Sequence, residues 1–226
     1  MTAEVTIAAR FCGPPESGNG GYTCGCLARV VGEPVAVTLR KPPPIDRPLT
    51  IRDGKLVDGD ALIASAERVV LDLDLPDPVD FGRAEDLAQR YIGREKHIVP
   101  GCFVCGTGRA PGDGLRIFPG KARVGEPAAA PWIPDPSLCD ERGEVSREIL
   151  WASLDCPGYF GAMESMEMAV LGRMTGAIDR SVRAGERCVI MGWLLGREGR
   201  KVHAGSALWN EAGELVGRSR QTWILL

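Results

Sequence analysis

The order of predicted helices and strands in the first half of the chain is repeated in the second half. The first half has a stretch of small residues that predicts a helix, then β-branched and apolar runs that predict strands, at residues 23–31, 35–39, 48–52 and 62–67. The second half has a helical stretch that continues or restarts at a proline, then further strands, at residues 148–154, 157–163, 170–178, 188–195, 202–209 and 214–226. A helix followed by a meander of strands, present twice, predicts two α+β units.

Two short motifs occur at matching places in the two halves. Ile45-Asp46-Arg47 corresponds to Ile178-Asp179-Arg180, and the turn at Gly59 corresponds to the turn at Gly213. The stretch between the halves is rich in Asp and Pro and then permits a helix over residues 83–91. We therefore expect an N-terminal unit at residues 1–82, a connecting segment at 83–94 and a C-terminal unit at 95–226.

A proline-rich stretch at residues 124–140 interrupts the predicted strands of the second half. Proline fixes the backbone and removes a hydrogen-bond donor, which favours irregular structure. Trp132 and Ile133 lie within the stretch and need apolar surroundings. We expect an ordered loop here rather than a flexible linker.

Composition and charge limit the classes of function. Hydrophobic residues make up 44% of the 226 positions and charged residues 25%, as in ordinary globular proteins. A net charge of −3 creates no field that favours nucleic acid or an anionic membrane. The N-terminal residues lack the pattern of a signal peptide, and no apolar run approaches the roughly 20 residues of a membrane span. We therefore expect a cytoplasmic protein whose eight cysteines are reduced thiols.

Several stretches resemble the hotdog thioesterase superfamily. Cys102-Phe103-Val104-Cys105-Gly106, followed by Gly114-Leu115-Arg116, resembles the opening of a hotdog unit in thioesterases of the phenylacetate-pathway kind. Residues 151–158 resemble their central helix, and the layout of the second half is similar to that of double-hotdog acyl-CoA thioesterases. The resemblance implies an α+β double hotdog, with two antiparallel sheets that each wrap round a central helix and join edge to edge.

The resemblance also implies which residues carry the chemistry. In double-hotdog thioesterases a helix Asp and a late-strand Gln position the attacking water, and here these positions are Asp155 and Gln221. A hydroxyl residue completes the family pattern, but the matching position holds Ala177. Thr175 and Ser181 are nearby and out of register. A plain alternative for Gln221 is a side chain that faces solvent.

Hydrolysis of a thioester needs a base for water and donors for the developing oxyanion. Asp155 precedes Pro157 and Gly158, so that the amides of a helix beginning here are candidate donors. An Asp before a first-turn Pro is also typical of a simple N-cap, and this reading stays open beside the catalytic one.

The first half offers a second candidate stretch, Asn19-Gly20-Gly21. A similar Asn-Gly-Gly region lines the thioester site in related single-hotdog enzymes, which implies substrate binding here. A helix cap followed by small packing residues is the structural alternative.

A coenzyme A ligand carries phosphates and therefore needs cations near its binding site. Arg180, at the Ile-Asp-Arg turn of the second half, is the candidate, with Arg40, Lys41, Arg183 and Arg187 at or near the equivalent turns. Ordinary solvated charge is the alternative for these side chains.

Other chemistries find little support. Cys102 and Cys105 form one close pair, which His97 and Cys139 could extend to four ligands, but structural zinc sites show two close pairs, so we expect no metal. Cys156 has no histidine near it in sequence that would make it a nucleophile. A serine-hydrolase elbow, a P-loop and a dinucleotide fingerprint are absent, and we expect no cofactor.

The sequence thus predicts hydrolysis of an acyl thioester, most simply an acyl-CoA. The alternative is a non-catalytic hotdog protein that binds an acyl ligand or a partner protein. A hotdog dehydratase is less favoured because no histidine lies in either central-helix segment. The sequence does not reveal the acyl type or chain length, and a homodimer is left open as the assembly.

Overall fold

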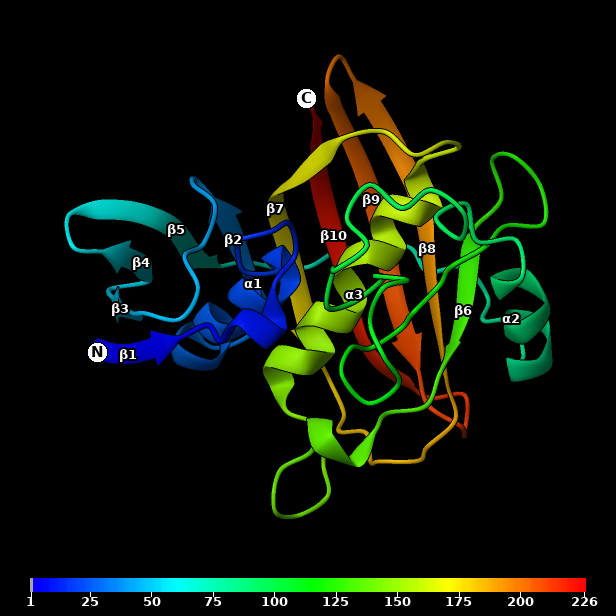
Figure 1. Cartoon of the computed structure of the whole chain (residues 1–226), viewed down its shortest axis with the longest axis horizontal. Coiled ribbons are helices and arrows are strands. Elements are labelled where there is room, and N and C mark those ends of the chain that lie inside the picture. The colour runs from blue at the N-terminus through cyan, green and yellow to red at the C-terminus, as the bar shows by residue number, and fades with distance from the viewer. Residues whose placement is uncertain (1) are drawn as a thin grey trace.

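A single sheet forms the frame of the molecule (Figure 1). The computed structural model describes residues 2–226. The strands are β1 (Thr2–Thr6), β2 (Val35–Leu39), β3 (Pro48–Arg52), β4 (Lys55–Asp58), β5 (Ala61–Arg68), β6 (Ala128–Trp132), β7 (Ala169–Ile178), β8 (Cys188–Glu198), β9 (Lys201–Trp209) and β10 (Leu215–Leu225). The helices are α1 (Gly20–Val31), α2 (Phe81–Ala88) and α3 (Arg147–Ala162), with short 3-10 turns η1 (Ala9–Phe11) and η2 (Pro136–Leu138).

The strand order shows that the sheet is a duplication. The ten strands run β1-β3-β4-β5-β2-β7-β10-β9-β8-β6. Read from either edge, each half has the order first, third, fourth, fifth, second, with its helix between its first and second strands. The repeat of elements predicted from the sequence is therefore confirmed.

The two sheets that were expected to join edge to edge form one continuous sheet. The innermost strands of the two halves, β2 and β7, pair antiparallel from Val35 with Gly176 to Thr38 with Arg173. Backbone N–H and C=O groups at an open sheet edge need hydrogen-bond partners. At the join, β2 supplies partners for β7, and β7 supplies partners for β2. The result is one continuous sheet of ten strands.

Helices α1 and α3 lie side by side against one face of the sheet (Figure 1). They run antiparallel: Gly21 lies against Ala152 and Asp155, whereas Gly25 lies against Glu148 and Trp151. A Cβ atom on Gly21 would come within 2.8 Å of the Trp151 carbonyl oxygen, so the close approach of the helices requires glycine there.

Helix α3 is continuous from Arg147 to Ala162, and its N-cap is Ser146. The expected start of a helix at Asp155 is therefore wrong, as is the N-cap reading of that residue. Pro157 lies inside the helix although it cannot donate a backbone hydrogen bond. Residues 149–162 are all buried, and this packing outweighs the local preference of proline to end a helix.

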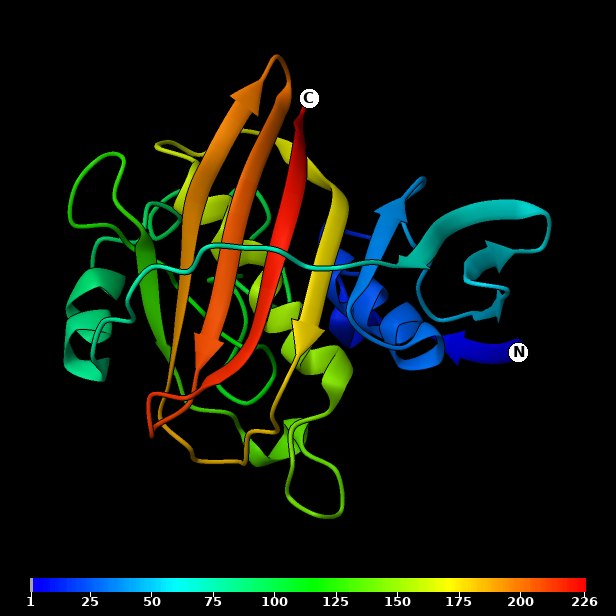
Figure 2. The same ribbon diagram turned by 180° about the vertical axis from the view of Figure 1, so that it is seen from behind.

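Residues 69–80 cross the opposite face of the sheet and lead to α2 (Figure 2). Alternate residues of β8 divide between the two faces. Ile190 packs in the main core, while Val189 and Met191 pack with Ala84 and Leu87 of α2. The helix predicted over residues 83–91 is thus present, slightly displaced, and covers the second face.

The proline-rich stretch contains a strand that the sequence did not reveal. β6 pairs with β8 from Ala128 with Gly192 to Trp132 with Cys188. Pro131 is tolerated because β6 is an edge strand, where a missing donor leaves no neighbour unpaired. Trp132 is buried as expected, whereas Ile133 is 53% exposed.

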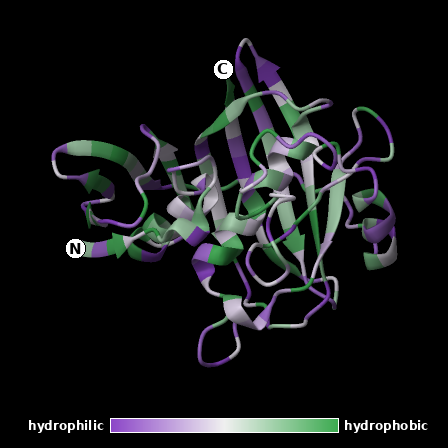
Figure 3. Cartoon of the chain, in the orientation of Figure 1, coloured by the Kyte–Doolittle hydropathy of each residue, from purple (hydrophilic) through white to green (hydrophobic). Residues whose placement is uncertain are grey.

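The hydropathy pattern follows this architecture (Figure 3). Apolar residues gather where α1 and α3 meet the sheet, and polar residues gather at the outer turns. None of the helices in the described part of the chain has the length and apolar character needed to cross a membrane.

Candidate functional site

Asp155 lies at the crossing of α1 and α3 and is only 2% exposed. Its Oδ2 atom accepts hydrogen bonds from Asn19 Nδ2 at 2.8 Å and from the Gly21 backbone N–H at 2.9 Å. Its Oδ1 atom has no hydrogen-bond partner within residues 2–226. One carboxylate oxygen is thus fixed by the first half of the chain, and the other is free to act as an acceptor.

Asn19 holds Asp155 and caps α1 at the same time. Its Oδ1 atom accepts from the Tyr22 N–H at 2.9 Å, as an N-cap does, while its Nδ2 group donates to Asp155. The side chain is buried, and both ends of its amide are used. The cap reading and the site reading of this stretch are therefore compatible.

The N-terminus of α1 also supplies an unused donor. Gly20 is the first residue of the helix, and its N–H has no hydrogen-bond partner in the described chain. It adjoins the Gly21 N–H that binds Asp155. Exposed N–H groups at a helix N-terminus favour negative charge, which is the property an oxyanion site needs.

Burial shapes the charge of the site. Removal from water raises the pKa of the Asp155 carboxyl to about 7, although the Gly21 and Asn19 donors act in the opposite direction. A carboxyl with such a pKa exchanges a proton readily near neutral pH, as general acid–base catalysis requires.

Gln221 is buried beneath α3 and is 1% exposed, so the alternative of a solvent-facing side chain is wrong. Its Nε2 group donates to the Leu154 carbonyl oxygen at 2.6 Å and to Ser219 Oγ at 2.9 Å. Its Oε1 atom accepts from Trp223 Nε1 at 2.7 Å. Gln221 therefore holds the turn of α3 that carries Asp155, and no hydrogen bond joins the two side chains in the described chain.

We expect the Gln221→Ala variant to be less stable by about 2–4 kcal/mol, because it leaves a cavity, leaves the Trp223 Nε1–H without its partner and leaves the Leu154 carbonyl oxygen with Ser206 Oγ as its side-chain donor. Denaturant unfolding would measure the loss. Arg220→Ala is the matched control, since Arg220 is the exposed neighbour on the same strand. Equal stability of the two variants would show that Gln221 does not hold α3.

Pro157 and Gly158 follow Asp155 within the same turn of α3, where the helix meets the sheet. A Cβ atom on Gly158 would come within 2.1 Å of Gln221 Oε1, and one on Gly192 of β8 within 1.8 Å of the Pro157 carbonyl oxygen. The expected first-turn amides are not formed here, because this is the interior of a helix. The free helix N-terminus beside Asp155 is that of α1 instead.

The remaining predicted positions lie apart from Asp155. The Arg180 side chain is about half exposed (52%) and pairs with Glu214 at 3.3 Å. Ala177 is buried in β7, where it pairs with Arg218 of β10. Thr175 faces Ala36 and Arg220 across the sheet. In the described chain no hydroxyl side chain bonds to Asp155. No neighbour therefore replaces the hydroxyl that the family pattern has at the position of Ala177.

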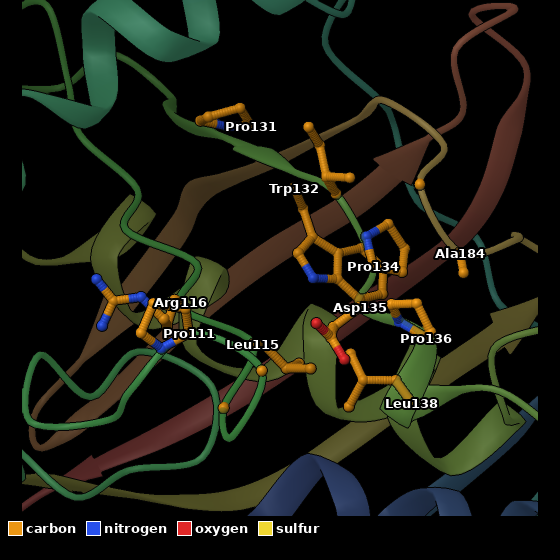
Figure 4. Close-up of a pocket in the computed structure, with 14 residues that line it drawn as sticks. Pro111, Leu115, Arg116, Pro131, Trp132, Pro134, Asp135, Pro136, Leu138 and Ala184 are labelled. Carbon is orange, nitrogen blue, oxygen red and sulfur yellow. The ribbon is translucent and has the colours of Figure 1, made fainter.

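A cavity of about 530 Å³ opens at a different place (Figure 4). Trp132, Leu115 and Leu138 give it apolar walls, and Arg116 and Asp135 give it charge. Its lining includes neither Asp155 nor the residues that bind Asp155. Asp135 in the cavity wall accepts from the N–H of Ser137 in the turn that follows it, whereas Asp155 is buried and held by donors from the other half of the chain, which favours the helix crossing as the candidate site.

Comparisons with known proteins agree with this architecture at the level of fold. No family model matches the chain, and no curated protein matches it in sequence. The tesB protein of Mycobacterium avium subspecies paratuberculosis superposes with a TM-score of 0.63 at 12% identity, over 100% of this chain and 92% of that one. A hot dog fold protein of unknown function from Alicyclobacillus acidocaldarius superposes with a TM-score of 0.62 at 10% identity, over 100% and 93%.

The chain has the hotdog fold. Both neighbours superpose over the whole chain, and the strand order occurs twice within its single sheet. The resemblance on Cys102–Gly106 and on residues 151–158 thus led to the correct fold. A zebrafish protein described as thioesterase superfamily member 2 matches 52% of this chain and 88% of its own at 20% identity, with a TM-score of 0.45.

Sequence reasoning named Asp155, Asn19 and Gly21 without joining them. Asn19 and Asp155 are 136 positions apart, and no local pattern shows that they bond. The signal that could have joined them is the duplication itself, because a repeated helix in one sheet must pack beside its copy. Asn19-Gly20-Gly21 begins one helix, and Asp155 lies within the other.

Proposed function

We propose that this hotdog protein hydrolyses an acyl thioester, most simply an acyl-CoA, at the crossing of α1 and α3. The observation that carries the proposal is that the two carboxylate oxygens of Asp155 have different surroundings. Asn19 and Gly21 hold Oδ2, and Oδ1 is buried without a partner. An oriented carboxylate with one free oxygen can accept the proton of an attacking water.

The reaction follows from this arrangement. Water gives a proton to Asp155 Oδ1 while its oxygen bonds to the thioester carbonyl carbon. The carbonyl oxygen becomes an oxyanion, which the Gly20 N–H at the start of α1 stabilises. When the C=O bond re-forms, the C–S bond breaks, and the thiolate takes the proton back from Asp155. The products are a carboxylic acid and a free thiol, and the carboxylate is restored.

Other residues support this reaction at a distance. Gln221 positions the α3 turn through the Leu154 carbonyl, and Pro157 and Gly158 let that turn approach the sheet. Arg180 is the proposed cation for the phosphates of a coenzyme A group, by exchange of its surface pair with Glu214. An intracellular acyl-CoA as the substrate agrees with the predicted cytoplasmic location.

One observation favours the alternative of a non-catalytic acyl-binding or partner-binding hotdog protein. Asp155 is 2% exposed, and the cavity of about 530 Å³ lies elsewhere. A site that stays closed could retain its carboxylate for packing alone. Binding without turnover is the property that separates the two proposals.

The test is a panel of acyl-CoAs of different chain length, including aromatic acyl groups, with release of free thiol as the measurement. We expect turnover on at least one member, well above the rate without protein. If no member is hydrolysed while calorimetry detects binding of one of them, the acyl-binding alternative holds.

A further inference from the structure

Three buried cysteines meet beside Asp155 although they come from separate parts of the chain. Cys102 and Cys105 lie in the turn at residues 99–106, and Cys156 lies in the middle of α3. The three sulfur atoms all lie within 4.8 Å of one another, and Cys102 Sγ and Cys156 Sγ are 3.7 Å apart. The side chains are at most 7% exposed.

The turn that carries Cys102 and Cys105 is closed by its own backbone hydrogen bonds. The Cys102 N–H donates to Val99, and the Gly106 N–H donates back to the Cys102 carbonyl oxygen at 2.9 Å. A Cβ atom on Gly106 would come within 2.4 Å of that oxygen, so only glycine allows so tight a turn.

The spacing of the sulfurs fits a metal ion. Zinc–sulfur bonds of about 2.3 Å in a tetrahedral site place neighbouring sulfurs about 3.8 Å apart. The observed 3.7 Å between Cys102 and Cys156 matches this value, and the 4.8 Å limit for the other pairs requires only a small contraction. Soft thiolate ligands select thiophilic ions over Mg²⁺ or Ca²⁺.

We propose that Cys102, Cys105 and Cys156 form a binding site for a thiophilic metal ion, with Zn²⁺ as the ordinary occupant. The expectation of no metal rested on a single close pair of cysteines. α3 supplies the third ligand, 54 positions after Cys102, where no sequence spacing would reveal it. Binding releases the thiol protons and holds the turn against the helix that carries Asp155.

The two extra ligands that the sequence suggested do not take part. Cys139 lies against the Asp135 carbonyl oxygen, outside the three-sulfur group. His97 Nδ1 accepts a hydrogen bond from the Val99 N–H, so the neutral ring carries its proton on Nε2 and cannot ligate through that atom. The fourth position of a tetrahedral ion is therefore left to a small ligand such as water.

The test measures metal and not turnover, so it is independent of the proposed hydrolysis. Full-length protein is expressed with added zinc, purified under reducing conditions and analysed for metal content. We expect about one zinc per chain, as for other structural thiolate sites. Replacement by Co²⁺ should give the intense sulfur-to-cobalt charge-transfer absorption and the visible bands of a tetrahedral thiolate site.

Matched variants assign the ligands. Cys105→Ala and Cys156→Ala should each lower the zinc content at least about tenfold. Cys188→Ala should retain it, because Cys188 is equally buried in β8 and lies outside the cluster. The cobalt spectrum of the wild type decides the matter even if a variant fails to fold.

Two results would overturn the proposal. One is wild-type protein that neither contains zinc nor shows thiolate–cobalt absorption after exposure to Co²⁺. The other is a disulfide between Cys102 and Cys156 in protein prepared under reducing conditions, shown by peptide mapping, since a stable disulfide would remove two of the three ligands.

Discussion

The Asp155→Asn variant should lose about 10²–10⁴-fold in turnover on the best acyl-CoA, because an amide cannot accept the proton of the attacking water. The amide oxygen can still accept from Asn19 and Gly21, so both hydrogen bonds that fix the side chain can persist. We therefore expect the fold to remain and the melting temperature to change little. Steady-state kinetics and thermal unfolding of the same preparation measure the two effects.

A surface carboxylate provides the control for this substitution. Asp179 is the middle residue of the Ile178-Asp179-Arg180 motif and pairs with Arg218 at the surface. Asp179→Asn should leave turnover within about twofold, since an exposed ion pair contributes little to stability or geometry. Wild-type turnover in Asp155→Asn would remove the carboxylate from the mechanism and leave it a packing role.

The Gly192→Ala variant should be destabilised by about 3 kcal/mol or more, at the upper end of the cost of overpacking. The new Cβ would lie 1.8 Å from the Pro157 carbonyl oxygen, which belongs to the backbone of α3 and cannot rotate away. The helix must then move off the sheet. For a chain of this length we expect a fall in melting temperature of roughly 6–12 °C.

Gly196→Ala on the same strand is the matched comparison. A Cβ atom there meets nothing within 4 Å, and the residue has no positive φ that alanine would strain. Its melting temperature should differ from the wild type by less than about 2 °C. If both alanine variants unfold together, the contact between α3 and β8 at Gly192 does not limit stability.

Strands with β-branched or alternating residues could be located from the sequence almost to the residue. β2 and β3 have the predicted bounds, and β9 differs by one position. The signal is local in these cases, because side chains on a half-buried strand reflect its two faces. β6 gave no such signal: its alanines and Pro131 have low β preference, and pairing with β8 alone makes it a strand.

The helix that carries the candidate site shows the opposite behaviour. Pro157 read locally predicts a helix start, and Asp155 before it reads as a cap. Burial of the whole segment keeps the helix continuous through Asp155 and Pro157, and this burial depends on packing against the sheet and α1. The same limit applies to Asn19 beside Asp155 and to Cys156 beside Cys102, since these contacts join distant parts of the chain.

The duplication of the sheet also bears on stoichiometry. Counted from the N-caps Asn19 and Ser146, the position in α1 that corresponds to Asp155 of α3 is Ala28. Ala28 is 2% exposed and carries no carboxylate, and the counterpart of Asn19 is a serine whose side chain makes no capping bond. The two halves share a fold, but at this position only the second half carries a buried carboxylate. Binding of a non-hydrolysable acyl-CoA analogue should accordingly saturate at one ligand per chain, whereas two units that each carried the carboxylate would bind two.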